Sequence, residues 1–300
     1  MKLAHYFRGK EIRVGIVQNG SIFDMQDSLK GLGLLRDVSL TIDRILSEDL
    51  LKTVRDVQDE ISSGKAGIPV SSIKLSSPIL NPEKILLVGL NYKSHSNEQR
   101  VKPPKEPYFF TKFKNTLIGH EDPIIIPKVS KKVDWEVELA VIIGKTGKSI
   151  SRKDALDYVA GYAVGNDISF RDFQTSTLSP EGVSPLGMNW VKGKGLDSSF
   201  PLGPWMVTKD EIYDPQQLSI SLTRNGKVEQ DSTTSEMFFP IDELIEYLSA
   251  GMTLKPGDVI STGTPEGVAL NTGKAFLKDG DLIEATISKI GTLRNPVKAE

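Results

Sequence analysis

The chain has 300 residues, enough for a sizeable core and for two domains. Its composition, 38% hydrophobic and 25% charged, is that of an ordinary globular protein, and its net charge of −2 argues against a nucleic-acid partner. Cysteine is absent, which excludes disulfides, and no apolar run approaches the ~20 residues that span a bilayer. The first residues lack the apolar region of a signal peptide, so we expect a cytoplasmic enzyme with no membrane partner.

The N-terminal part of the sequence predicts a small β/α domain over about residues 1–75. Two apolar runs, 13–17 and 21–24, flank Asn19-Gly20, a dipeptide typical of a type I′ hairpin turn. Apolar residues at three- and four-residue spacings predict a helix over 40–61.

The remainder, about residues 80–300, is rich in predicted strands and forms the expected second, larger domain. Helices are expected over 152–159, opened by a capping box of Ser151 and Asp154, and over 240–249. Few strands precede a crossover helix, which favours an α+β arrangement over a doubly wound parallel sheet. The expected strands are 85–89, 108–112, 124–126, 136–143, 162–167, 205–208, 218–224, 227–229, 259–262 and 282–287.

The most informative segment is DWEVELAVII (134–143), which reads as one strand because β-branched and apolar residues dominate it. Side chains alternate along a strand, so Glu136 and Glu138 project to the same side. Two neighbouring carboxylates repel unless a cation or a proton neutralises them, and a hard divalent ion is suited to that task. A half-buried strand with solvated glutamates is the alternative, and this segment alone does not decide between them.

Asp167 ends another apolar strand, at YAVGND (162–167). It is either a cap for the next segment or a third ligand beside Glu136 and Glu138. The three together would form a half-shell of oxygen ligands that leaves positions open for water or substrate.

His95 and Glu98 lie in the polar segment GLNYKSHSNE (89–98). In a short helix they would share a face, and the carboxylate would fix the imidazole tautomer and leave one ring nitrogen to act as a base. A surface histidine beside a surface glutamate is the ordinary alternative. The proline-studded segment 99–107 that follows is either an inert loop or a lid.

Lys192 and Lys194 lie among glycines in WVKGKG (190–195) and could hold a carboxylate or a developing enolate, although solvated loop lysines are more common. The turn TGTPEG (262–267) could hold an anion through its hydroxyls and amides, or could simply be a turn.

Taken together, these segments resemble the fumarylacetoacetate hydrolase family, within it the branch similar to acylpyruvases and 2-hydroxyhepta-2,4-diene-1,7-dioate isomerases. The resemblance runs from about residue 80 to the C-terminus, and residues 1–75 look like the small appended domain of longer members. Family analogy supplies the expected fold, a mixed β-sandwich roll, and the chemistry. The matching segments are GLNYKSHSNE (89–98), PYFFTKFKNTLIGH (107–120), DWEVELAVIIG (134–144), YVAGYAVGNDISFRDFQ (158–174), WVKGKGLDSSFPLGPW (190–205), NGKVEQDSTTSEM (225–237) and LKPGDVISTGTPEGV (254–268).

The resemblance implies a role for each matching position. It implies that Glu136, Glu138 and Asp167 are the ligands of Mg²⁺ or Mn²⁺, with Ca²⁺ as an alternative ion in crystals. It makes Lys194, rather than Lys192, the catalytic lysine beside the His95–Glu98 pair of a mobile lid. Further matching positions, expected to contact substrate, are Lys112, Arg171, Gln174 and Thr264. The segment Thr175–Gly187 is longer than in compact members and would alter the pocket rim.

The activity implied by the resemblance is metal-assisted hydrolysis of a carbon–carbon bond in a β-diketo acid of the acylpyruvate or fumarylpyruvate type. The alternative is isomerisation or decarboxylation of a 2-oxo or 2-hydroxydienoate dicarboxylic acid, such as oxaloacetate, at the same site. A metal-stabilised scaffold without catalysis is a third reading. The expected partner is a small 2-oxo or dicarbonyl acid, and the family resemblance implies a homodimer.

Overall fold

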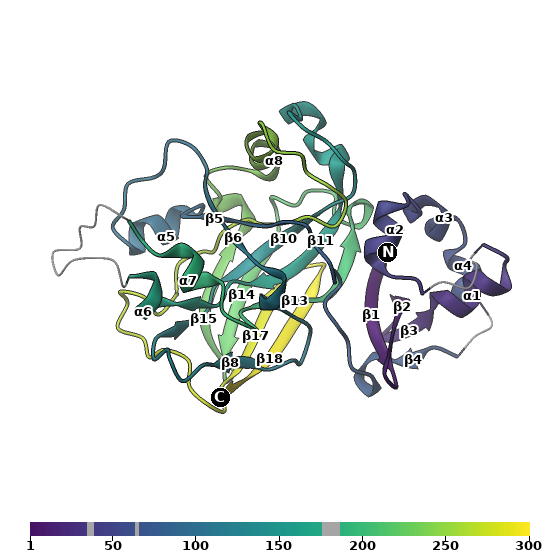
Figure 1. Ribbon diagram of the computed structural model, residues 1–300, viewed down its shortest axis with the longest axis horizontal. Coiled ribbons are helices and arrows are strands. Elements are labelled where there is room, and N and C mark those ends of the chain that lie inside the picture. Colours follow the sequence, from purple (N-terminus) through teal and green to yellow (C-terminus); the bar gives the residue numbers. More distant parts are fainter. Residues whose placement is uncertain (35–38, 64–65, 176–186) are drawn as a thin grey trace.

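The computed structural model describes residues 1–34, 39–63, 66–175 and 187–300. A smaller lobe built from the N-terminal residues lies beside a larger lobe that contains the C-terminus (Figure 1). Both lobes combine strands and helices, so the predicted α+β, strand-rich class is confirmed.

The smaller lobe contains the predicted hairpin, with Asn19 and Gly20 at φ values of 48° and 75° in its turn. The single helix predicted over 40–61 is wrong, because Asp49 takes a φ of 55° and ends the first helical segment. Three short helices follow one another there instead. The elements are β1 (Lys2–Arg8), β2 (Glu11–Gln18), β3 (Ser21–Asp24), β4 (Ile68–Pro69), α1 (Met25–Gly31), α2 (Ile42–Ser47), α3 (Leu51–Asp56) and α4 (Gln58–Ser62).

One sheet runs through both lobes because β1 pairs with β13 (Phe200–Thr208). Its order across the described residues is β4-β3-β2-β1-β13-β11-β10-β16-β5-β6, with β7 on β13. The strands are therefore continuous across the predicted domain boundary, and the division near residue 75 stays a prediction. The bounds of the further members are β5 (Ile85–Gly89), β6 (Tyr108–Lys112), β7 (Leu117–Ile118), β10 (Val137–Ile143), β11 (Val159–Asn166) and β16 (Val259–Ser261).

A second sheet, of order β15-β14-β17-β18-β8, packs against the larger lobe's part of the first sheet. Its strands are β8 (Ile124–Ile126), β14 (Ser219–Arg224), β15 (Lys227–Thr233), β17 (Leu282–Ile287) and β18 (Gly291–Ala299). The short strands β9 (Val133–Asp134) and β12 (Ser169–Phe170) pair with each other.

Strand β10 is apolar on both faces, and each face packs on a different core. Val137, Leu139 and Val141 belong to the core shared with the second sheet. Ala140 and Ile142 belong to a core shared with the N-terminal lobe. Burial on both faces explains why the segment is an almost unbroken apolar run, and it leaves charged residues room only at the end of the strand.

The helices of the larger lobe are short, and α5, α6 and α7 gather at its end farthest from the smaller lobe (Figure 1). The expected capping box at Ser151 is not formed, because its hydroxyl bonds the Asp154 side chain, and the turn that follows is a 3₁₀ helix, Arg152–Tyr158. The α-helices are α5 (Lys93–Glu98), α6 (Arg171–Gln174), α7 (Trp190–Lys194) and α8 (Ile241–Ser249).

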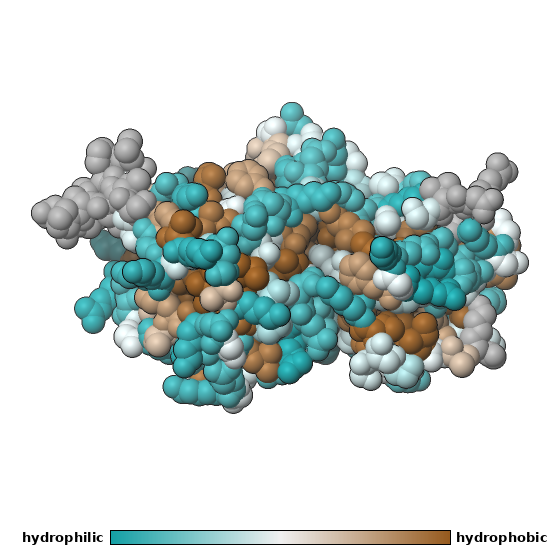
Figure 2. All heavy atoms as spheres, turned by 60° about the horizontal axis from the view of Figure 1, so that its bottom comes forward, coloured by the Kyte–Doolittle hydropathy of each residue, from teal (hydrophilic) through white to brown (hydrophobic). Residues whose placement is uncertain are grey.

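Apolar side chains on one face of the molecule form several separate patches, over both lobes, with hydrophilic residues between them (Figure 2). Among the described residues, no helix is both long and apolar enough to cross a membrane. The homodimer expected from the resemblance stays a prediction.

Candidate active site

Strand pairing brings together three carboxylates that lie far apart in the sequence. The antiparallel register places Val137 of β10 opposite Asn166 of β11, so the start of one strand meets the end of the other. Glu136 and Asp167, one residue beyond this pair, are joined by a backbone hydrogen bond of 2.8 Å. Oxygen atoms of Glu136, Glu138 and Asp167 all lie within 4.8 Å of one another. The structure therefore brings the predicted ligands into one buried cluster.

The strand predicted over the whole of residues 134–143 is interrupted at Trp135 and Glu136, so Glu136 lies just before β10 rather than within it. Asn166 explains the interruption, since its side-chain oxygen, rather than a backbone carbonyl, accepts the Glu136 N–H at 3.0 Å. Glu136 and Glu138 still face the same cavity.

Two buried cations hold Glu136 in place. Lys194 Nζ lies 2.8 Å from Glu136 Oε2 and 2.6 Å from Asp167 Oδ2. Arg171 Nη2 donates to Glu136 Oε1 at 2.6 Å, and its Nε donates to Asp134 at 2.8 Å. The α6 and α7 helices supply these cations, so both helices are tied to the start of β10.

Burial and charge divide the carboxylates into two kinds. Burial alone would raise the pKa of Glu136, but the charges of Lys194 and Arg171 outweigh it and hold this pKa below its usual value. Burial, together with the charges of Asp167 and Glu136, raises the pKa of Glu138 well above its usual value. Burial also raises the pKa of Asp167, although Lys194 and Lys112 oppose the shift. Glu138 therefore carries the charge that the protein's own cations compensate least.

The donor set fits a divalent metal ion. Asp167 Oδ1 makes no hydrogen bond within the part of the chain that the structure describes, although Lys112 Nζ lies 3.1 Å from it. Glu138 is held by hydrogen bonds from the Ser261 hydroxyl and the Gly263 N–H. Burial and the charges of Asp167 and Glu136 raise its pKa, and a bound cation would relieve that repulsion. Three carboxylates at this spacing are typical ligands of hard ions such as Mg²⁺ and Mn²⁺.

The structure separates the three candidate lysines. Lys194 is almost fully buried and lines the cavity, whereas Lys192 is exposed and its ammonium lies 5.2 Å from the Phe173 ring. Lys112, expected to contact substrate, is not among the cavity-lining residues. Its ammonium instead donates to the carbonyls of Ile168 and Ser199, each at 2.9 Å, so it supports the loop that carries Asp167.

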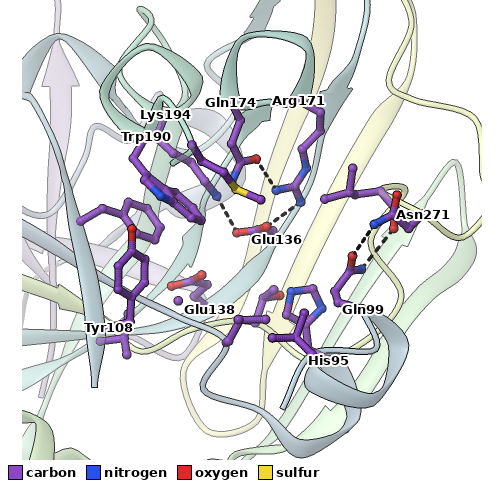
Figure 3. A pocket seen from close by; sticks show the side chains of 18 residues that line it. His95, Gln99, Tyr108, Glu136, Glu138, Arg171, Gln174, Trp190, Lys194 and Asn271 are labelled. Carbon is purple, nitrogen blue, oxygen red and sulfur yellow. Dashed lines mark hydrogen bonds and ion pairs between the residues drawn. The ribbon is translucent and has the colours of Figure 1, made fainter. Parts of the chain in front are cut away.

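Glu136 and Glu138 open into a cavity of about 200 Å³, and Asp167 lies behind them, outside its lining. Figure 3 shows Glu136 between Lys194 and Arg171, with Glu138 below it and His95 facing them across the cavity. The expected residues Arg171, Gln174 and Thr264 also line the cavity. The lining consists of Val88, Gly89, Leu90, His95, Gln99, Val101, Tyr108, Phe110, Glu136, Glu138, Arg171, Gln174, Met188, Trp190, Lys194, Thr264, Leu270 and Asn271.

Helix α5 forms over the predicted polar segment and places His95 and Glu98 on one face. His95 Nδ1 lies 3.2 Å from Glu98 Oε2, and Glu98 Oε1 accepts the Gly267 N–H at 2.8 Å. The carboxylate therefore holds both the imidazole and the turn that follows β16. Among the described residues, no hydrogen bond engages the other ring nitrogen of His95, which lines the cavity.

Several lining residues were not predicted from the sequence. The Phe110 and Trp190 rings stack with centroids 4.7 Å apart, and Tyr108 lies 5.5 Å from Trp190, which gives the cavity an aromatic wall. Gln99 and Asn271 line the opposite side (Figure 3). The aromatic run YFF in β6 was a usable signal, but its partner lies on α7, and no local pattern joins the two.

Asp134 was also missed, although it opens the DWEVE motif. It is fully buried and accepts hydrogen bonds from the backbone N–H groups of Ala269 and Leu270, at 2.8 and 3.0 Å, besides its ion pair with Arg171. It therefore links the arginine beside Glu136 to the loop that borders the cavity.

Comparison with known proteins agrees with this geometry. Residues 84–298 match the family described as Fumarylacetoacetate (FAA) hydrolase C-terminal. The chain belongs to the fumarylacetoacetate hydrolase family. The segments that suggested this family from the sequence lie within the matched region.

Members of the family that resemble this chain differ in their named activities. The mitochondrial oxaloacetate tautomerase fahd2 of Xenopus laevis is 44% identical over 253 residues, which cover 84% of this chain and 76% of that protein. The 2-hydroxyhepta-2,4-diene-1,7-dioate isomerase of Mycobacterium marinum is 30% identical with a TM-score of 0.73, covering 100% of this chain and 99% of its own. The maleylpyruvate hydrolase of Sphingobium sp. SYK-6, in complex with manganese(II) and pyruvate, is 32% identical with a TM-score of 0.78 over the same shares.

These relatives correct one expectation and qualify another. The cytoplasmic location expected from the sequence is wrong by this comparison, because the relatives named as oxaloacetate tautomerases are named as mitochondrial. The chain is an enzyme of the family, but carbon–carbon hydrolysis is only one of the activities that its relatives carry. A divalent metal agrees with both the carboxylate cluster and the manganese complex of the hydrolase.

Proposed function

We propose that this protein interconverts the keto and enol forms of a 2-oxo dicarboxylic acid of the oxaloacetate type, with a divalent metal as cofactor. The observation that carries the proposal is the buried trio of Glu136, Glu138 and Asp167 beside the cation Lys194, in a protein 44% identical to an oxaloacetate tautomerase. This is the isomerase alternative of the sequence analysis, and the named relatives support it better than hydrolysis.

The chain supplies binding groups for the 2-oxo acid end of such a substrate. Glu136, Glu138 and Asp167 would hold the metal, which supplies Lewis-acid stabilisation of negative charge on the substrate's oxygens. Lys194 Nζ borders the same space, and its three N–H groups bond Glu136, Asp167 and Ser169. Once the metal takes over one of these carboxylates, Lys194 would donate a hydrogen bond to the oxygen on C2, where charge develops in the enolate. Arg171 keeps Glu136 ionised and oriented.

A proton must leave or reach C3, and we assign that transfer to His95, which lines the same cavity as Glu136 and Glu138. Its Nδ1 is engaged by Glu98, so Nε2 is the nitrogen that would accept the C3 proton as the C2–oxygen bond gains enolate character. Return of a proton to the oxygen gives the enol, and the reverse sequence gives the ketone. No atom is lost or gained overall.

Hydrolysis is the second candidate, and the same His95–Glu98 contact of 3.2 Å favours it. An imidazole oriented by a carboxylate could activate water for attack on the distal carbonyl of an acylpyruvate. Similarity to the maleylpyruvate hydrolase supports this reading, but the identity is lower, 32% against 44%.

The test follows the enol absorbance of oxaloacetate with the protein in Mg²⁺, in Mn²⁺ and in chelator. We expect chelator-sensitive acceleration of enol–keto equilibration without release of CO₂. Carbon dioxide release would assign decarboxylation instead. Cleavage of maleylpyruvate or acetylpyruvate, with no effect on oxaloacetate, would assign hydrolysis and overturn the proposal.

A further inference from the structure

The two ends of the cavity differ in chemistry. One end holds Glu136, Glu138 and Lys194, and an aromatic wall flanks them. The amide side chains of Gln99 and Asn271 lie at the other end of the cavity, near His95 and away from Tyr108 and Trp190 (Figure 3). A substrate whose 2-oxo acid end lies at the carboxylates can therefore extend toward these amides.

A dicarboxylic substrate also brings a second negative charge into the cavity. The lysine and arginine side chains among the described lining residues are Arg171 and Lys194. Each is already paired with two carboxylates: Arg171 with Asp134 and Glu136, Lys194 with Glu136 and Asp167. The second carboxylate must therefore find neutral hydrogen-bond donors, and it must lie where water can still reach it.

Gln99 and Asn271 satisfy both conditions. Asn271 Nδ2 donates to Gln99 Oε1 at 3.0 Å, and Gln99 Nε2 donates to the Leu270 carbonyl at 3.1 Å. Each amide nitrogen carries two protons, so these bonds fix the two side chains and leave the second N–H of Asn271 without a partner in the described part of the chain. The second N–H of Gln99 makes only a long hydrogen bond, of 3.4 Å, to Glu98 Oε2. Asn271 is exposed and Gln99 half-buried, so a carboxylate there keeps part of its hydration.

The backbone favours this arrangement. Asn271 has a φ of 61°, in the left-handed region that asparagine tolerates better than most residues, and this turns its side chain toward α5. The Asp134 carboxylate accepts hydrogen bonds from the N–H groups of the two preceding residues, Ala269 and Leu270, and so fixes the backbone there. The amide pair is thus a built feature of the cavity rather than two adjacent surface side chains.

We propose that Gln99 and Asn271 are specificity-determining residues that bind the second carboxylate of a dicarboxylic 2-oxo acid. This inference rests on the proposed function, since it assumes that the 2-oxo acid end lies at Glu136, Glu138 and Asp167. It assigns the substrate class: an acid whose second carboxylate reaches the side of the cavity beside His95.

The test compares two substrates that share the 2-oxo acid end, oxaloacetate and 2-oxobutanoate, of which only the first has a second carboxylate. Enolisation of both substrates is measured by NMR as the exchange of C3 protons for deuterium. The protein is loaded with Mg²⁺ and kept free of Mn²⁺. Gln99→Leu and Asn271→Leu should each raise the KM for oxaloacetate about tenfold, the effect of one hydrogen bond to a charged group at a partly hydrated position. The KM for 2-oxobutanoate should be unchanged.

Gln99→Glu sharpens the comparison, because it keeps the side-chain size and adds a negative charge. Gln99→Glu should raise the KM for oxaloacetate more than Gln99→Leu does. Asn97 is an exposed residue of the same helix, so Asn97→Leu is the matched control. It should leave the KM for both substrates unchanged. Thermal unfolding and metal content of every variant establish that the fold and the metal site are intact.

An equal rise in KM for both substrates would overturn the proposal, since the amides would then act only by holding α5 in place. Binding measured by calorimetry separates this from failure of the proposed function. If the wild-type protein exchanges neither substrate but binds oxaloacetate with a Gln99-dependent affinity, the carboxylate assignment stands and the tautomerase reaction does not. If it binds neither acid, both proposals fall.

Discussion

Lys194 Nζ lies 2.6 Å from Asp167 Oδ2, and both side chains are buried. The same ammonium reaches Glu136, so a single cation neutralises two of the three carboxylates in the cluster. A metal ion bound by these oxygens would take over part of that neutralisation. The protein's own cation and the metal are therefore alternative partners for the same charges.

Replacing the cation with an apolar side chain of similar length tests this relationship. Lys194→Met should destabilise the metal-free protein by about 3 kcal/mol, because it removes one of the two buried cations beside each carboxylate and leaves Glu136 with Arg171 and Asp167 with Lys112. Metal should restore much of the loss. Denaturant unfolding with chelator and with Mn²⁺ measures both values. Lys192→Met, on the exposed side of the same helix, should change neither, and an equal loss of stability with and without metal would contradict the idea.

Glu138 should decide whether metal binds at all. Glu138→Gln removes a ligand charge and also removes the repulsion that the ion relieves, so we expect loss of most of the bound metal with no loss of stability in chelator. Metal content by mass spectrometry and thermal unfolding measure the two effects. Glu48→Gln, an exposed acid of the N-terminal lobe, is the control. Stoichiometric metal in Glu138→Gln would remove Glu138 from the ligand set.

The pH dependence of metal affinity follows from the same residue. Metal binds the ionised carboxylate, and burial raises the pKa of Glu138, so protonation competes with the metal at a higher pH than for an ordinary glutamate. The affinity for metal should have its full value above that raised pKa and should fall as the pH drops through it. Calorimetry in buffers of different ionisation enthalpy would also detect protons released on binding. An affinity that is flat down to the usual range of a glutamate would contradict this.

The sequence predicted the grouping of the three carboxylates better than the details of the fold around them. Alternation on a strand and a carboxylate at a strand end made Glu136, Glu138 and Asp167 candidates, but these local patterns left alternatives open, and the family resemblance selected them as metal ligands. Antiparallel register then places them together, and that pairing is a property of the sheet. The single helix over 40–61 failed because the positive φ of Asp49 has no signature in apolar spacing.

Contacts between distant segments were beyond local reasoning. Lys112 looked like a substrate contact, but the fold turns it toward backbone carbonyls of segments more than fifty residues away. Gln99 and Asn271 lie 172 positions apart in the chain, and neither has a pattern that indicates the other. The segment Thr175–Gly187, expected to alter the pocket rim, lies for the most part outside the described residues.

His95 provides the last prediction, because its role can be separated from its packing. His95→Ala should keep the fold and the metal, since α5 is held by Gln99 and by the Glu98–Gly267 contact, but should lower kcat about 10²–10⁴-fold as expected for loss of a general base. Lys93→Ala, exposed at the start of the same helix, should leave kcat unchanged. If His95→Ala unfolds the protein, or leaves kcat intact, the base must lie elsewhere in the cavity.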